Sequence, residues 1–130
     1  MPSTQMKDIS YEIIGCAYEV HRTLGPGLLE SVYQKALVQE LKLRGFKVKS
    51  EVDIEINYKG VNVGSDLRLD IIVNDTIIIE LKSVETILPI HKKQLLTYLR
   101  LTNFQLGLLI NFNTNLLKDG ITRIVNNFNE

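Results

Sequence analysis

The sequence predicts one α/β domain in which two helices precede three strands, a third helix and one or two further strands. Apolar residues recur at three- and four-residue steps in residues 8–24 and 29–44, as in amphipathic helices. Residues 51–58 alternate between apolar and polar, as in a strand with one wet face, and residues 104–112 are apolar on both faces, as in an interior strand. With 130 residues, 45% of them hydrophobic, the chain 1–130 is expected to form a single domain around one core.

Both predicted N-terminal helices have recognisable ends. The first stops at Gly25-Pro26-Gly27, because glycine followed by proline is a usual helix stop, and Gly45 is the expected C-terminal cap of the second. The apolar stripe of the first helix consists of Ile9, Ile13, Cys16, Ala17, Val20 and Leu24. That of the second consists of Leu29, Val32, Tyr33, Ala36, Leu37 and Leu41.

The first strand is expected to turn back at Lys59-Gly60 into a second strand, which Gly64-Ser65 predicts to contain a bulge. That second strand carries Asp70 and is followed by an apolar strand carrying Glu80. A two-residue turn between them would set the apolar face of each strand against the polar face of the other. A three-residue loop over residues 74–76, or a bulge of the same parity, is therefore predicted.

The predicted register pairs Val73 with Ile77, Ile71 with Ile79 and Leu69 with Leu81, and it places Asp70 directly opposite Glu80. In the first strand of this hairpin, alternation assigns one face to Leu67, Leu69, Ile71 and Val73 and the other to Arg68, Asp70 and Ile72. In the second strand it assigns one face to Ile77, Ile79 and Leu81 and the other to Thr76, Ile78, Glu80 and Lys82.

The C-terminal part begins with a loop over residues 83–88, after which Pro89 occupies the first position of a helix that extends to about Leu101. The interior strand 104–112 follows. Asp119-Gly120 and the alternation after it predict a short edge strand with Ile121, Arg123 and Val125, and residues 126–130 are expected to be frayed.

The composition excludes some classes of protein. No apolar run approaches the length of a membrane span, and the N-terminus has no export signature, which favours a cytoplasmic protein with no membrane contact. A single cysteine, Cys16, excludes an intramolecular disulfide and a cysteine zinc cluster. Fifteen basic and fifteen acidic residues neither support nor exclude a nucleic-acid partner. The basic clusters 42–49 and 92–100 are expected to be solvated faces.

Asp70, Glu80 and Lys82 interrupt two otherwise apolar strands and suggest a metal-dependent phosphodiesterase site. Two neighbouring carboxylates repel each other unless a cation lies between them, and Mg²⁺ is a common partner of such pairs. Lys82 shares the face of Glu80, so its amine can approach the same water. The alternative is a buried ion pair, of Glu80 with Lys82 or of Asp70 with Arg68, but such pairs rarely arise for stability alone.

Gly27-Leu-Leu-Glu30-Ser-Val-Tyr33 matches the pattern for which the GxxExxY protein family is named. Asp70 with Glu80-Leu-Lys82 resembles the core of the PD-(D/E)XK nuclease superfamily, of which that family looks like a branch, although Leu69 stands where the superfamily motif has proline. Gln94-Leu-Leu-Thr-Tyr98 resembles an element that follows this core in several exonuclease branches. The resemblance covers residues 8–125.

This resemblance implies a restriction-endonuclease-like core, with a small mixed sheet flanked by helices in the order ααβββαβ(β), and a Mg²⁺ or Mn²⁺ site. Asp70, Glu80 and the backbone carbonyl of Leu81 would bind the metal, with Glu30 as an auxiliary acid and third carboxylate. Lys82 would activate the water and stabilise charge in the transition state.

Four further residues are candidates for substrate binding. Gln94 and Tyr98 lie one helical turn apart and could hold a phosphate or a base. His21 could approach the site from the end of the first helix, and Arg68 would face Lys82 in the predicted register and could contact a phosphate. The bland alternatives are a helix-start acid for Glu30, a core aromatic for Tyr98, a surface residue for Gln94 and a structural histidine for His21.

Three functions remain open. The first is a metal-dependent nuclease that hydrolyses DNA, plausibly as a homodimer in which two sites cut two strands. The second is a catalytically silent accessory module, binding nucleic acid or protein, that keeps the nuclease fold. The third is a regulatory protein that acts through protein contacts, which an exposed apolar patch on the first helix would support.

Overall fold

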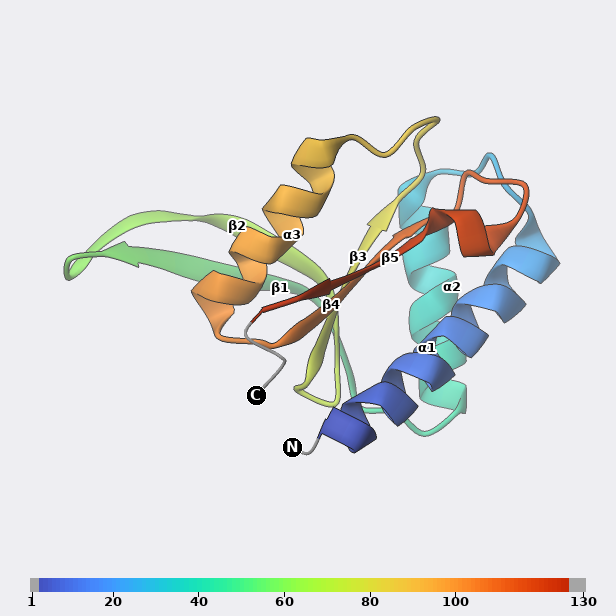
Figure 1. The fold of residues 1–130 in the computed structure, drawn as a ribbon, viewed down its shortest axis with the longest axis horizontal. Helices are drawn as coiled ribbons and strands as arrows, with labels where there is room; N and C mark the ends of the chain where they lie inside the picture. Colours follow the sequence, from blue (N-terminus) through green and yellow to red (C-terminus); the bar gives the residue numbers. More distant parts are fainter. Residues whose placement is uncertain (1–2, 127–130) are drawn as a thin grey trace.

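The computed structural model describes residues 3–126, which form a five-stranded mixed sheet with helices on both faces (Figure 1). The elements, in chain order, are α1 (Ser3–Leu24), α2 (Glu30–Leu43), β1 (Val48–Tyr58), β2 (Val61–Val73), β3 (Ile77–Lys82), α3 (Pro89–Thr102), β4 (Leu106–Asn111), the 3₁₀ helix η1 (Leu117–Gly120) and β5 (Ile121–Val125). The predicted α/β class and the predicted order are confirmed, including the final edge strand.

Strand order in the sheet follows the chain, β1-β2-β3-β4-β5. All neighbouring strands are antiparallel except β3 and β4, which are parallel and are connected through α3. The helices α1 and α2 cover one face of the sheet and α3 covers the other (Figure 1). A first core therefore lies under α1 and α2 and a second under α3, and strands β3 and β4, which separate the two cores, are almost fully buried.

The helix ends agree closely with the predicted ones. α1 begins at Ser3, earlier than the predicted residue 8, and α2 has Leu29 as its N-cap and Arg44 as its C-cap. Gly45 follows with φ of 88°, and hydrogen bonds from Gly45 N to Lys42 O and from Phe46 N to Leu41 O form a Schellman motif. The predicted cap is confirmed, because a left-handed residue at this position suits glycine.

The three-residue loop of the β2–β3 hairpin is also confirmed. Val73 pairs with Ile77 and Ile71 pairs with Ile79, as the alternation of side chains predicts. Pairing between the two strands ends at Ile71 and Ile79, so the predicted backbone pairing of Leu69 with Leu81 does not form. Asp70 and Glu80 lie directly beyond this last pair.

One face assignment in β2 is wrong. Leu67 and Leu69 pack in the second core under α3, whereas Ile71 and Val73 pack in the first core. The paired strand β1 changes sides at the same place, since Val48 packs with the first core and Val52, Ile54 and Ile56 pack with the second. The change falls at Glu51, whose left-handed φ of 53° turns the peptide after it and interrupts simple alternation. Asp70 therefore lies where the apolar side chains of β2 change from one face of the sheet to the other.

Beyond that point, β1 and β2 continue as an arm that projects from the sheet (Figure 1). Lys59 and Gly60, with φ values of 49° and 86°, make the tight turn at its tip, and a register shift near Gly64 confirms the predicted bulge. Tyr58 is 61% exposed there, and the Lys59 amine lies 5.3 Å from the centre of its ring.

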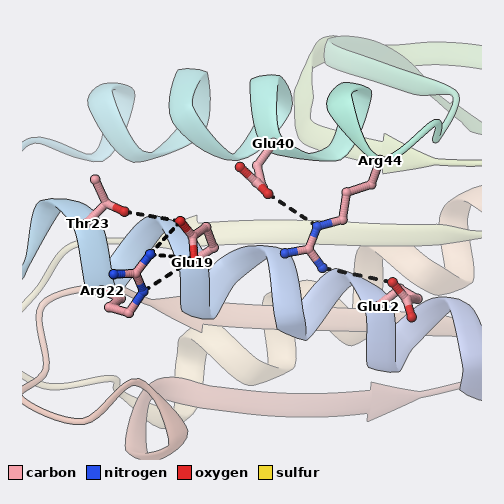
Figure 2. A network of polar contacts seen from close by, with 6 residues as sticks. All are labelled: Glu12, Glu19, Arg22, Thr23, Glu40 and Arg44. Carbon is pink, nitrogen blue, oxygen red and sulfur yellow. Dashed lines mark hydrogen bonds and ion pairs between the residues drawn. The ribbon is translucent and has the colours of Figure 1, made fainter.

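The basic side chains of residues 42–49 lie on a solvated face, as predicted, and three of them, Arg44, Lys47 and Lys49, also form ion pairs there. Figure 2 shows Arg44 between Glu40, at 3.2 Å, and Glu12 of α1, at 3.9 Å, beside a separate group formed by Glu19, Arg22 and Thr23. Lys47 and Lys49 both contact Asp75 in the β2–β3 loop, at 2.7 and 3.0 Å. These contacts connect α1 with α2, and β1 with the β2–β3 loop, and surface pairs of this kind contribute little stability individually.

At the C-terminal end, Asn126 is held by hydrogen bonds to Gln105 O and Phe104 O, so it is not frayed as predicted. The rest of the segment predicted to fray, residues 127–130, lies outside the described residues. Among the helices of residues 3–126, none has the length and apolar character needed to cross a membrane.

Candidate metal centre

Asp70 and Glu80 lie together at the end of the β2–β3 pairing. The Asp70 carboxylate accepts a hydrogen bond from the backbone N–H of Leu81 at 2.8 Å. The backbone of Asp70 lies near enough to the Glu80 carboxylate to lower its pKa slightly. The hydrogen bond from Leu81 therefore holds the Asp70 carboxylate beside Glu80.

Glu80 is the most strongly perturbed acid of the site. Its residue is 8% exposed, and its Oε1 has no hydrogen-bond partner among the described residues. Burial, and then the negative charge of Asp70, raise the pKa of Glu80 to about 8 from its ordinary 4.5; Lys82 acts in the opposite direction. A buried carboxylate oxygen without a partner is costly, so this atom is suited to bind a cation or a proton.

Asp70 is half-buried, and its pKa is also raised, mainly by desolvation. The hydrogen bond from Leu81 and the charge of Lys82 lower this pKa, while Glu30 and Glu51 raise it. Lys82 is half-buried at the end of β3 and is close enough to influence both acids. The three residues predicted to form the chemical core are thus brought within electrostatic range of one another.

α3 contributes Tyr98 to the same region. Its ring packs against the second core, and burial followed by the charges of Glu80 and Asp70 raises its pKa. Gln94 lies one turn earlier on α3 and is exposed. Tyr98 therefore borders the two acids, and Gln94 lies on the solvent side of the same helix.

Glu30 is the first residue of α2 and is exposed. The buried Tyr33 fixes the loop before it: the Tyr33 hydroxyl donates to the carbonyl of Gly25 and accepts from the backbone N–H of Leu28. The Tyr33 ring stacks on Phe112 of the β4–η1 segment, with centroids 4.6 Å apart. Tyr33 is thus a structural residue that places Glu30 at the edge of the site.

The donor set can be compared with the needs of a divalent cation. Within residues 3–126, no group of three or more Asp, Glu, His or Cys side chains is arranged to hold a metal ion, so Glu30 does not join Asp70 and Glu80 in a three-carboxylate cluster. Two carboxylates remain, one with an unpartnered buried oxygen. Mg²⁺ and Mn²⁺ prefer such oxygen ligands and retain several waters, so the residues present fit a hard divalent cation.

Two of the predicted substrate-binding residues have other partners. The His21 ring donates from Nε2 to the backbone carbonyl of Thr114, at 2.8 Å, and lies 6.4 Å from the Phe112 ring. Arg68 contacts Asp53 at 3.3 Å and Glu51 at 3.9 Å on β1 instead of facing Lys82, since pairing of β2 with β3 ends before it. The contacts of His21 favour the structural role, and Arg68 belongs to the arm.

Two polar residues near the site carried no recognised sequence signal. Gln34 of α2, one turn after Glu30, donates from Nε2 to the carbonyl of Asp70 and to Glu51, both at 3.4 Å. Asn111 at the end of β4 is 2% exposed and bonds to the segment after Lys82. The only available signal for Asn111 was a carboxamide at the end of an otherwise apolar strand.

Comparison with known proteins shows the family of the chain. Residues 7–124 match the family model of the PD-(D/E)XK nuclease superfamily. The chain therefore belongs to the PD-(D/E)XK nuclease superfamily, whose members are generally nucleases and typically use divalent metals.

Among solved structures, the chain is similar to the crystal structure of SSO0001, with 30% identity and a TM-score of 0.52. The similarity covers 74% of this chain and 50% of that one, so the chain spans half the length of that protein. No curated protein matches.

Proposed function

We propose that this chain is a Mg²⁺- or Mn²⁺-dependent nuclease of the GxxExxY branch, which hydrolyses DNA phosphodiester bonds with an activated water. The observation that carries the proposal is the buried, unpartnered Oε1 of Glu80 beside Asp70. Two carboxylates whose pKa values are raised by burial are disfavoured as a charged pair. Acids with strongly perturbed pKa values cluster at functional sites.

In this proposal Asp70 and Glu80 hold the cation, together with the Leu81 carbonyl at the same place on β3. When bound, the metal would supply Lewis acidity to the scissile phosphate and to the attacking water. Lys82 orients that water and stabilises negative charge that develops on the phosphate. Glu30 acts from the edge of the site as an auxiliary acid.

Substrate contacts are assigned to the α3 side. Tyr98 borders the acids, and Gln94 is exposed one turn away, so both can position a phosphate or a base. That His21 and Arg68 contact the substrate stays a prediction. Both side chains already have the partners described above, which argues against this role. Homodimerisation would let two such sites cut two strands, and the cytoplasm is the proposed location.

The test is a calorimetric titration of Mn²⁺ into the wild-type protein and into the Asp70→Ala and Glu55→Ala variants, with DNA cleavage measured on the same samples. Glu55 is an exposed acid on β1, outside the site, and serves as the matched control. Loss of binding and of cleavage in Asp70→Ala but not in Glu55→Ala is expected. Absence of Mn²⁺ binding by the wild-type protein would refute the metal centre.

A second candidate function is a regulatory protein that acts through protein contacts. The observation that favours it is the exposed side chains of Tyr11 and Tyr18 on α1, which lie two turns apart and are 77% and 44% exposed. A catalytically silent accessory module would instead bind Mn²⁺ without cleaving single- or double-stranded DNA in the titration above.

A further inference from the structure

Asn111 places a carboxamide at a buried position where β4 ends. The five residues before it in β4 are apolar and buried, and Asn111 itself is 2% exposed. A buried amide destabilises a protein unless its donor and its acceptor are both hydrogen-bonded. The partners of Asn111 therefore indicate what the residue is for.

The main partner is the backbone of Val84, in the segment that follows Lys82. Asn111 Oδ1 accepts from Val84 N at 3.1 Å, and Asn111 Nδ2 donates to Val84 O at 2.9 Å. These are the two bonds that a neighbouring strand would provide. The side chain of Asn111 thus extends the pairing of β3 with β4 beyond the last backbone pair, Lys82 with Asn111.

The segment from Lys82 to Val84 is held at three successive residues. Phe112 N donates to Lys82 O at 3.0 Å, Ser83 Oγ donates to Leu28 O at 2.6 Å, and Asn111 holds Val84. Leu28 belongs to the loop that precedes Glu30. The same segment therefore connects the backbone of Lys82 to the loop that precedes Glu30, the proposed auxiliary acid.

The backbone of Asn111 lies close to Gly120 at the end of η1. A Cβ added to Gly120 would lie 2.2 Å from the backbone oxygen of Asn111, which leaves room only for glycine. The carboxamide itself has a second partner, because Asn113 N donates to Asn111 Oδ1 at 3.2 Å. Hydrogen bonds to both Val84 and Asn113 thus hold the carboxamide in place.

We propose that Asn111 is a positioning residue for Lys82: its carboxamide holds the backbone of Val84 and thereby sets where the Lys82 amine lies relative to Asp70 and Glu80. This inference rests on the proposed nuclease function, in which Lys82 orients the attacking water. Asn111 contacts neither the acids nor Lys82 through its side chain in the described hydrogen bonds, so its effect is transmitted through the backbone.

The test combines hydrogen exchange with a double-mutant cycle. The variants are Asn111→Ala, Asn111→Asp, which keeps the shape but loses the donor to Val84 O, and Asn115→Ala, an exposed loop control. Exchange of the Val84 amide should be slow in the wild-type protein and fast in Asn111→Ala, while the Leu108 amide stays protected in all of them. Protection of Leu108 also identifies variants that have merely unfolded.

For Mn²⁺-supported DNA cleavage, Asn111→Ala and Asn111→Asp should lower kcat by about 10- to 100-fold with little change in KM, because a small misplacement of a catalytic group has effects of this size. In the Lys82→Ala background the same substitutions should change kcat by less than about twofold. An equal loss of kcat in both backgrounds would overturn the proposal.

The exchange measurement separates this inference from the proposed function. If the wild-type protein binds no Mn²⁺ and cleaves nothing, the proposed function fails, and a slow Val84 amide that depends on Asn111 still supports the positioning of this segment. If the Val84 amide exchanges rapidly in the wild-type protein, the positioning role fails whatever the activity.

Discussion

The carboxylate of Asp70 accepts a hydrogen bond from the backbone N–H of Leu81, at 2.8 Å, where the backbone pairing of β2 and β3 has ended. A side chain here takes the place of a backbone carbonyl in the ladder. The strands remain connected, and both acids are held against the same short segment of β3. This hydrogen bond keeps the two carboxylates close together, although burial raises the pKa of each.

The stability of the metal-free protein should fall as pH rises through neutrality. The pKa of Glu80 is about 8 in the folded protein and 4.5 ordinarily, so between these values the folded state binds more protons than the unfolded state. The free energy of unfolding therefore decreases from about pH 4.5 to about pH 8, by on the order of 2–5 kcal/mol, and then levels off. Urea denaturation in the presence of a chelator measures this curve.

Glu80→Gln should flatten that pH dependence, because the amide does not titrate. Glu55→Gln, on the exposed face of β1, should leave the wild-type curve unchanged. A wild-type slope that persists in Glu80→Gln would mean that another group is responsible.

Under the proposed function, Lys82→Met should lower DNA cleavage by about 100-fold or more, since it removes the amine proposed to orient the water but keeps the aliphatic stem. Lys82 lowers the pKa of both acids, so its loss should also move the pH dependence of Mn²⁺ binding upward. Single-turnover cleavage and calorimetry at several pH values measure the two effects. Lys92→Met, on the exposed surface of α3, is the matched control, and an equal effect of both variants would argue against a specific role for Lys82.

Glu30→Gln distinguishes a metal ligand from a charge that acts at a distance. Glu30 raises the pKa of Asp70 and of Glu80, so its neutralisation should move the pH dependence of Mn²⁺ binding downward. A carboxylate that acts only at a distance also attracts the cation, so above the pKa of Glu80 its loss should weaken Mn²⁺ binding by about tenfold at most. A much larger loss there, measured by calorimetry, would instead identify Glu30 as a direct ligand.

Tyr33→Phe should destabilise the fold by about 1–3 kcal/mol, because the Gly25 carbonyl and the Leu28 N–H each lose the tyrosine hydroxyl as a partner. Stacking on Phe112 is retained, so the loss reports on the loop before Glu30. Denaturant unfolding measures the change, with Tyr58→Phe at the exposed tip of the arm as the control. A loss of less than 0.5 kcal/mol would mean that the hydroxyl does not hold this loop.

Local patterns in the sequence were sufficient for the order of the elements and for the hairpin between Asp70 and Glu80. Side chains alternate strictly along a strand, so the loop length that brings Ile71 opposite Ile79 follows from parity alone. The cap at Gly45 and the turn at Lys59-Gly60 depend on backbone conformations that few residues adopt, so the sequence predicts both of them as well.

Contacts between distant segments decided the rest. The change of face in β1 and β2 arises from the left-handed backbone of Glu51. This conformation is uncommon for glutamate, so the residue type does not predict it. His21 was assigned to the site from its place on α1, but its partner, Thr114, lies 93 residues away. Arg68 was assigned from a register that the strands do not continue far enough to form.

The acids themselves show the division most clearly. Charged residues in apolar strands indicated a site at Asp70, Glu80 and Lys82, because burying such groups without a function is unfavourable. Only the packing of β2, β3 and β4 with their connecting loops produces the raised pKa values of the acids, the unpartnered oxygen of Glu80 and the support of Val84 by Asn111. Residue type and spacing predicted which groups to expect at the candidate site, and long-range packing determined their solvation, their hydrogen bonds and their positions.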